Sequence, residues 1–231
     1  MFGIFPYDIE SGESKAIPFS IFRKRFPHAG GYLSKLKEKI TGSVETPSGK
    51  DLWHTYTREQ NLVRQPGSQV LVPMTAKDTF ATCDRTGELY CDNANVNFLK
   101  VEDADTNTHL ALAAIINSTT FSVLARLGAN PQSGGHFKFN KQFLWPIPFP
   151  SKNFISNSST RDGLASLTNN IERTQRHLIA AHSSKKEPLK QLLNHYWEQL
   201  DTLVEDLYKL TKNERTLIQR EGRATDRREI D

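Results

Sequence analysis

The 231-residue sequence contains two cysteines, no long apolar run and no basic segment followed by an apolar one at its start. The longest apolar stretch, Leu110 to Ile116, is far too short to cross a bilayer, so we expect no membrane span and no membrane partner. Without an export signal the expected location is the cytoplasm, where Cys83 and Cys91 would remain free thiols.

Motifs for common enzyme chemistry are missing as well. No glycine-rich loop follows a predicted strand, which argues against a nucleotide P-loop and a dinucleotide fingerprint. Two cysteines with scattered histidines do not suit a structural zinc site. The sequence also lacks the cluster of carboxylates with a lysine that would indicate a metal-dependent nuclease. Asn130-Pro131-Gln132-Ser133 departs from the Asn-Pro-Pro-aromatic motif that holds a flipped adenine, because Ser133 replaces the stacking aromatic. We therefore predict no catalytic residue, metal site or cofactor in this chain.

Acidic residues are absent from two long stretches of a chain whose formal net charge is +4. One lies between Asp105 and Asp162, and the other runs from Gln60 to Lys77. The longer stretch contains Arg126, Lys138, Lys141, Lys152 and Arg161, together with His109 and His136. Regions of one sign suit a polyanion such as DNA. The alternative is that acids elsewhere in the fold balance these cations, and charge alone does not separate the two interpretations.

Hydrophobic periodicity and turn residues predict mixed secondary structure before Pro150. A strand from Phe2 to Ile9 is followed by a helix that is capped by Ser20 and interrupted by Pro27. The other expected elements are a helix at Tyr32–Ile40, strands at Gln69–Pro73 and Val96–Val101, a hairpin joining Phe80–Cys83 to Leu89–Asp92, one long helix at His109–Leu127 and a strand at His136–Phe143.

After Pro150 the sequence becomes helical. A polar linker leads into amphipathic helices at Asp162–His182 and Glu187–Leu210, and the short joint between them predicts an antiparallel hairpin. Thr211 and Glu214 form a capping box for a final short helix. We therefore expect an α+β fold: a mixed α/β domain at residues 1–150, followed by an α-helical hairpin appendage with a charged tail at residues 151–231.

Two segments carry side chains suited to nucleic acid. The first gives the candidate DNA-binding residues Trp53, His54, Tyr56, Arg58 and Gln60. Arginine can bind guanine, and glutamine can bind adenine, through two hydrogen bonds each, while aromatic rings pack against sugar and backbone. Taken alone, this short segment favours the structural alternative, in which Trp53 lies in the core and Arg58 forms a surface ion pair.

The second segment follows a Ser-Gly-Gly turn. Its candidates are Ser133, Gly134, Gly135, His136, Lys138, Asn140, Lys141 and Gln142, and Lys77 is added from the shorter acid-free stretch. The polar residues alternate with Phe137, Phe139 and Phe143, so a strand would direct the phenylalanines inward. The glycines let the backbone approach a phosphate, and the lysines would neutralise it. An ordinary amphipathic strand is the alternative, and the acid-free setting favours DNA.

An ordered series of short motifs extends over nearly the whole chain. It comprises Phe5-Pro6-Tyr7, Arg25-Phe26-Pro27, Trp53-x-x-Tyr56-x-Arg58-x-Gln60, Val70-Leu71-Val72-Pro73, Ile116-Asn117-Ser118, Gly134-Gly135-x-Phe137-x-Phe139-x-Lys141-Gln142, Pro146-Ile147-Pro148 and a last part that ends in Leu210-Thr211-x-x-Glu214. In this order the motifs resemble the C-terminal target-recognition region of TaqI-type adenine-specific DNA methyltransferases, including fused restriction–modification enzymes.

The resemblance implies that residues 1–150 form a target-recognition domain that reads double-stranded DNA, largely in the major groove. Its partner would be a methyltransferase catalytic domain or subunit, which would hold S-adenosylmethionine and flip the adenine. Phe137 and Phe139 are expected to be architectural. The helical hairpin resembles the spacer helices with which specificity subunits dock onto catalytic subunits. The alternative from another class is a protein-interaction module that docks through this hairpin without DNA specificity.

Overall fold

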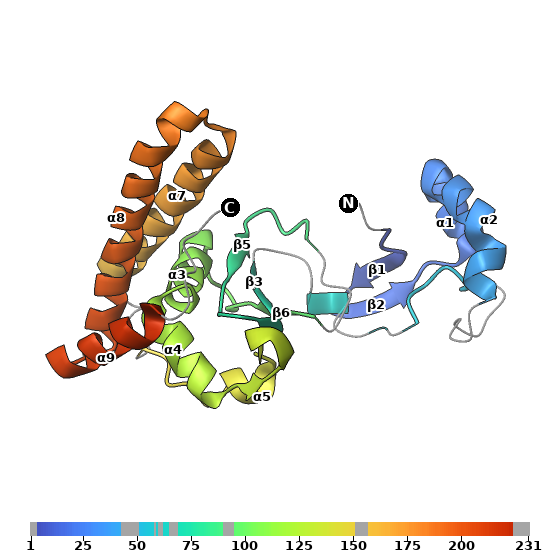
Figure 1. Ribbon diagram of the computed structural model, residues 1–231. Coiled ribbons are helices and arrows are strands. Elements are labelled where there is room, and N and C mark those ends of the chain that lie inside the picture. The colour runs from blue at the N-terminus through green and yellow to red at the C-terminus, as the bar shows by residue number, and fades with distance from the viewer. Residues whose placement is uncertain are drawn as a thin grey trace. The chain divides into compact units, whose positions relative to one another are not determined.

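The structure of the protein is a computed structural model that describes residues 4–42, 51–57, 59, 62–64, 69–89, 95–150 and 157–223 (Figure 1). Contacts along the chain divide it into an N-terminal unit, residues 1–66, and a C-terminal unit, residues 67–231. Together they combine helices with small antiparallel sheets, which confirms the expected α+β class at that level.

The N-terminal unit begins with a two-stranded antiparallel hairpin. Strand β1 (Tyr7–Glu10) pairs with β2 (Glu13–Ala16), and Ser11 and Gly12 form the turn with positive φ angles of 52° and 81°. The sequence indicated β1 and the turn but not β2. Its sequence, Glu-Ser-Lys-Ala, has no apolar alternation, so its extended conformation depends on pairing with β1.

Helices α1 (Phe19–Arg25) and α2 (Pro27–Thr41) follow, with Phe26 alone between them. Pro27 begins α2, because a proline at the first helical position gives up no hydrogen bond. Ser20 does not cap α1 as expected, since the N-cap is Pro18 and the Ser20 hydroxyl donates to Asp51 at 2.7 Å.

The two helices cross closely at Gly30. A Cβ atom at this position would lie 2.8 Å from the Arg23 Cα atom, so only glycine permits the contact. Four buried side chains form the core of the N-terminal unit. They come from the residue after β2, from the two helices and from the segment after residue 50: Ile17, Phe22, Leu33 and Trp53.

The C-terminal unit contains two three-stranded antiparallel sheets. In the first, β3 (Gln69–Pro73) lies between β5 (Thr82–Asp84) and β6 (Val96–Leu99), which confirms the strands expected at Gln69–Pro73 and from Val96. In the second, β8 (Phe137–Lys138) lies between β4 (Thr75–Ala76) and β7 (Asn130–Pro131).

The turn after β5 is held by one carboxylate. Asp84 accepts hydrogen bonds from the backbone N–H groups of Thr86, Gly87 and Leu89 at 2.8–3.2 Å. The sequence predicted a hairpin that joins Phe80–Cys83 to Leu89–Asp92. In the structure β5 pairs with β3, and most of Leu89–Asp92, including Cys91, lies outside the described residues. Cys83 is a free thiol whose pKa is raised by burial to about 11.

The long helix expected at His109–Leu127 is wrong, because two helices occupy this stretch. Helix α3 (Thr106–Ile116) ends at Asn117, and α4 (Thr119–Gly128) begins after the N-cap Ser118, with a bend of 64° between them. The Asn117 side chain instead bonds Ala81 in both directions, from Ala81 N to Oδ1 at 2.7 Å and from Nδ2 to Ala81 O at 2.8 Å. Asn and Ser favour such local bonds over a helix interior, which explains the break.

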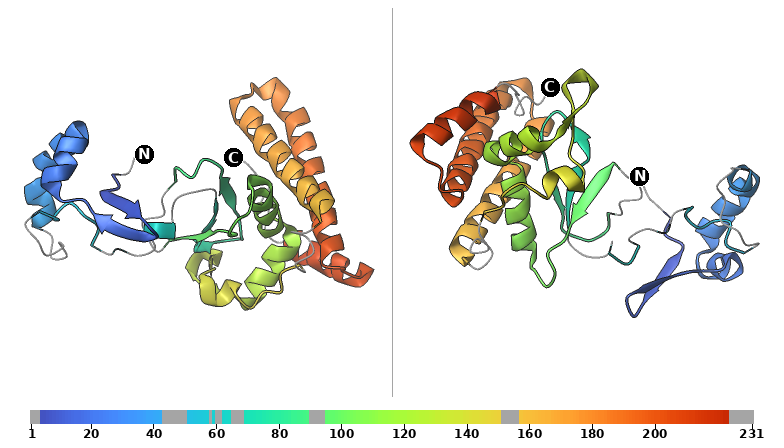
Figure 2. Two further views of the ribbon diagram at one scale, coloured as in Figure 1. Left: turned by 180° about the vertical axis from the view of Figure 1, so that it is seen from behind. Right: turned by 90° about the horizontal axis from the view of Figure 1, so that it is seen from below.

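Three helices complete the unit. Helices α7 (Ser158–Ala180) and α8 (Ser183–Leu207) form the expected antiparallel hairpin and run side by side in both views of Figure 2. Helix α9 (Lys212–Arg223) begins with the predicted capping box, in which Thr211 N–H donates to Glu214 Oε2 at 2.7 Å. Helix α7 packs against α3, and α9 packs against α4. The domain boundary expected at Pro150 stays a prediction.

Among the described residues, no single helix is long and apolar enough to cross a membrane. Helices α3 and α4 satisfy length and composition only as a bent pair, and α3 is a core helix that is buried from Thr108 to Ile116.

The crossing at Gly30 yields a test of the N-terminal unit. We expect Gly30→Ala to lower its free energy of unfolding by about 1–3 kcal/mol, because the added methyl group meets the backbone of α1. The neighbouring Gly31→Ala is the matched control: a Cβ there meets nothing within 4 Å, so the better helix propensity of alanine should stabilise by up to about 1 kcal/mol. Hydrogen exchange of the α1 and α2 amides measures both, and equal protection in the two variants would contradict the close crossing.

Candidate nucleic-acid interface

The second candidate segment forms a tight turn on the β4–β8–β7 sheet. After α4 the chain enters β7, turns through Ser133–Gly135 and returns as β8, with Asn130 opposite Lys138 and Pro131 opposite Phe137. Gln132 N–H donates to the His136 carbonyl at 2.7 Å and closes the turn. Gly134 and Gly135 adopt positive φ angles of 72° and 74°, which side-chain-bearing residues rarely adopt.

Most of the candidate side chains on this segment face solvent. The exposed candidates are Ser133, Gly134, Gly135, Lys138, Lys141 and Gln142, while His136 and Asn140 are half-buried. A Cβ at Gly135 would meet nothing within 4 Å, so the backbone of the turn is open to approach. These exposed groups are hydrogen-bond donors or small residues, and the segment contains no acid.

The strand expected at His136–Phe143 is wrong beyond Lys138. Phe139 N–H donates to the Met74 carbonyl at 2.7 Å, and the Asn97 side chain donates to the Phe139 carbonyl at 3.1 Å. Helix α5 (Lys141–Leu144) then replaces the expected strand. The inward direction of the phenylalanines holds in part, since Phe139 is fully buried and Phe137 packs half-buried at the edge of the core.

Pairing of β4 with β8 brings the two acid-free stretches together. Thr75 lies opposite Lys138 and Ala76 opposite Phe137, and the exposed Lys77 follows β4 directly. Lys77 therefore lies beside the turn that carries Lys138, although 61 positions separate the two in sequence (138 − 77). Among the described residues, no carboxylate forms an ion pair with Lys77, Lys138 or Lys141.

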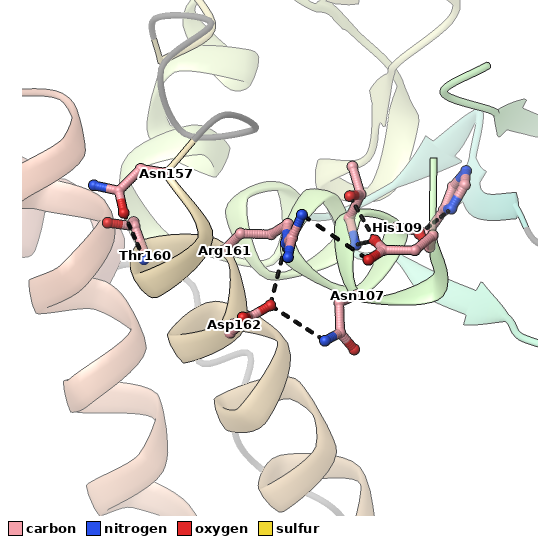
Figure 3. Close-up of polar contacts among 8 residues, drawn as sticks. Asn107, His109, Asn157, Thr160, Arg161 and Asp162 are labelled. Atoms are coloured by element: carbon pink, nitrogen blue, oxygen red, sulfur yellow. Dashed lines mark hydrogen bonds and ion pairs between the residues drawn. The ribbon is translucent and has the colours of Figure 1, made fainter. Parts of the chain in front are cut away.

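Other cations of the longer acid-free stretch are balanced by the fold. Arg126 pairs with Asp78 at 3.9 Å. Arg161 pairs with Asp105 at 3.9 Å and with Asp162 at 3.1 Å (Figure 3). His109 is structural, because its Nδ1–H donates to the Asp105 carbonyl and its Nε2 accepts from Val101 N–H. The alternative interpretation of the charge pattern is therefore correct for these residues, whereas Lys77 after β4, Lys138 on β8 and Lys141 on α5 form no ion pair within the described part of the chain.

Trp145 is a neighbour that the sequence analysis did not single out. It is 80% exposed, and the Lys141 Nζ atom lies 5.5 Å from the centroid of its ring. Tryptophan is enriched at interfaces, so an exposed ring beside Lys141 offers this segment a stacking surface. The signal in the sequence was a tryptophan at the end of a basic, acid-free segment.

Asn140 carries a buried polar atom in the same segment. It occupies the N-cap of α5 without forming a side-chain cap, and its Oδ1 atom is buried without a hydrogen-bond partner among the described residues. A buried acceptor left unpaired costs about 1–3 kcal/mol. That cost would be recovered by any ligand or rearrangement that supplies a donor.

The first candidate segment lies in the N-terminal unit, where its aromatic residues have structural roles. Trp53 is 3% exposed and contacts Phe19, with ring centroids 4.6 Å apart. His54 is also buried, and its burial lowers the pKa of the imidazole, an effect that the nearby Ile17 carbonyl opposes. Neither ring nitrogen of His54 reaches hydrogen-bond geometry with a described residue, so the ring packs as a neutral group.

Tyr56 ties this segment to the β1–β2 hairpin. Its hydroxyl donates to the Ile4 carbonyl at 2.8 Å, and its backbone N–H donates to the Tyr7 hydroxyl at 2.6 Å. Burial raises the pKa of Tyr7 to about 12. The two candidates suited to base edges, Arg58 and Gln60, lie outside the described residues.

The two tryptophans give a direct test of core against surface. We expect Trp53→Ala to destabilise the N-terminal unit by about 3–5 kcal/mol, because a buried aromatic is removed. Trp145→Ala should change the stability of its own unit by no more than about 0.5 kcal/mol, since most of its side chain already contacts water. Denaturant unfolding followed by circular dichroism measures both effects, and a large loss of stability in Trp145→Ala would overturn its assignment as a surface residue.

Comparison of the chain with models of known protein families and with curated proteins finds no match.

Proposed function

We propose that this chain is a sequence-specific DNA recognition module of an adenine-specific DNA methyltransferase, within a restriction–modification or related phage-defence system. One observation carries the proposal: pairing of β4 with β8 gathers the unpaired lysines of both acid-free stretches beside an open glycine turn. Phosphate binding by such lysines releases counterions from the duplex and supplies salt-dependent affinity.

The surrounding groups have distinct proposed roles. Lys77, Lys138 and Lys141 would neutralise phosphates, and the glycine turn would let its backbone come close to the sugar–phosphate chain. Ser133, Asn140 and Gln142 offer hydroxyl and amide groups that can bind phosphates or base edges. Phe139 anchors this segment just before α5, because its ring is fully buried and its carbonyl accepts a hydrogen bond from the Asn97 side chain. The segment thus combines one buried anchor, Phe139, with exposed polar side chains on the turn and on α5.

The reading of bases is assigned in part to the N-terminal unit. In this proposal Arg58 and Gln60 contact base edges, while Trp53, His54 and Tyr56 hold their segment in place rather than touching DNA. Methyl transfer needs a catalytic domain or subunit that carries S-adenosylmethionine, and the α7–α8 hairpin would dock onto it. The proposed location of this complex is the cytoplasm.

A protein-interaction module without DNA specificity is the second candidate. The observation that favours it is exposed apolar surface on the helical hairpin, where Ile179 is 71% exposed and Leu192 is also exposed. Apolar side chains of this kind are common contact points between proteins. This function predicts a stable protein complex together with no salt-dependent association with DNA.

Selection from a pool of randomised duplexes tests the proposed function. We expect recovery of one short sequence motif, either by the chain alone or after a methyltransferase partner is added. Lys138→Ala with Lys141→Ala should weaken binding to all duplexes and reduce the slope of log affinity against log salt by about two. The matched control, assayed with the chain alone because the α7–α8 hairpin is the proposed docking element for the partner, is Lys185→Ala with Lys186→Ala, which removes the same charge from exposed positions on α8. Equal effects of the two double variants would count against Lys138 on β8 and Lys141 on α5 as the contact.

Arg58→Ala tests base readout separately. Loss of a two-bond contact to guanine costs about 1–3 kcal/mol of discrimination, so the selected motif should become degenerate at one position. The salt slope should change little compared with the lysine variants. A uniform loss of affinity without a change in the motif would instead make Arg58 a phosphate contact.

A further inference from the structure

Helix α2 presents a narrow stripe of polar and aromatic side chains to solvent. The stripe consists of His28, Tyr32, Lys35 and Lys39, which follow one another at intervals of four, three and four residues. This spacing places all four side chains on one face of a helix. All four are exposed, and Tyr32 is 59% exposed.

The charge of the helix pair is strongly one-sided. Helices α1 and α2 contain six Lys and Arg residues against the single acid Glu38. Two of the cations are engaged within the unit, since Arg25 forms a two-bond ion pair with Asp8 and Lys37 lies over the Trp53 ring. No ion pair joins Lys35 or Lys39 to any carboxylate in the described part of the chain.

The stripe is held on a firm support. The opposite face of α2 buries Gly30 and Leu33, and Gly30 fixes the crossing with α1. Because α2 is 15 residues long and packs against α1, the backbone positions from which the stripe's side chains extend keep their spacing when a ligand approaches. Preorganised cations bind an extended anion at a lower cost in entropy than cations on a mobile segment do.

We infer that the stripe on α2 is a docking surface for the phosphate backbone of double-stranded DNA. The inference rests on the proposed function and extends it to the N-terminal unit, whose helices had no assigned role in binding. Lys35 and Lys39 would neutralise phosphates, and the Tyr32 hydroxyl would donate to a phosphate oxygen while its ring packs against a sugar. Such contacts fix orientation and add affinity without reading sequence.

An anionic membrane surface is the competing partner for a basic helix. Helices that bind membranes bury a broad apolar face among the lipids. In α2 the side chains of Ala29, Leu33 and Ile40 pack in the unit's core. The exposed large apolar side chains of the helix pair are Ile21, Phe26 and Tyr32, which are too few for a broad apolar face. The distribution of apolar side chains therefore favours a polyanion in water over a lipid surface.

The test uses the full chain, a fluorescent duplex and a salt titration. We expect Lys35→Ala with Lys39→Ala to reduce the salt slope by about two, so that the loss of affinity between roughly 50 and 200 mM salt becomes about tenfold smaller. The motif selected from randomised duplexes should stay the same, because phosphate contacts carry no base preference. Lys35→Arg with Lys39→Arg should retain the wild-type slope, and Lys185→Ala with Lys186→Ala serves as the charge-matched control in titrations of the chain without a methyltransferase partner. Circular dichroism verifies that each variant is folded.

The outcomes separate this inference from the proposed function. If the wild-type chain binds DNA and the Lys35/Lys39 double alanine variant keeps its slope, the docking surface is wrong and the recognition function stands. If the wild-type chain binds no duplex at low salt, with or without a methyltransferase partner, both are overturned. If the variant loses affinity for phosphatidylserine vesicles but not for DNA, α2 is a membrane contact and the inference is overturned.

Discussion

Helix α3 must be covered on every side, and the architecture of the C-terminal unit follows from that constraint. The helix is buried from Thr108 to Ile116 because it is apolar around its whole circumference. Strands β3 and β5 pack against it, α7 covers it elsewhere, and α8 in turn covers α7. Burial of each large aliphatic side chain contributes about 1.5–3 kcal/mol. One continuous core therefore joins α3 to the helical hairpin, and the β4–β8–β7 sheet is anchored to the same core through Phe139.

Elements with a local signal could be predicted from the sequence, and those that depend on distant partners could not. The strand Gln69–Pro73 and the capping box at Thr211 were predicted correctly, because the residues that form each of them are close together in the sequence. The break between α3 and α4 could not be predicted in this way, because it depends on residues far away in the sequence. Asn117 bonds Ala81, and the Asp201 carboxylate accepts from Thr119 N–H at 2.7 Å. Likewise, β2 and the end of β8 at Lys138 are set by the chain segments beside them.

The candidate site shows the same division. Absence of acids from two stretches correctly pointed to concentrated positive charge, but sequence could not tell which cations the fold neutralises. Arg126 meets Asp78 across 48 residues (126 − 78), a pairing that no local pattern encodes. Composition equally could not separate Trp53, which belongs to a core, from Trp145, which faces water. The basic stripe on α2 does not lie in an acid-free stretch, because Glu38 stands between Lys35 and Lys39 in the sequence, and only the helical spacing places the two lysines on one face.

The β4–β8–β7 sheet has strands of only two residues, so its ladder contributes little to holding the turn. The base is secured by Phe139 and its bonds to Met74 and Asn97 instead. The turn from Gln132 to His136 is thereby energetically separate from the core, and apart from its two glycines it can change in sequence at small cost to folding. A surface built in this way is free to diverge quickly, so that related chains could acquire new preferences by exchanging a few exposed residues while the scaffold stays the same.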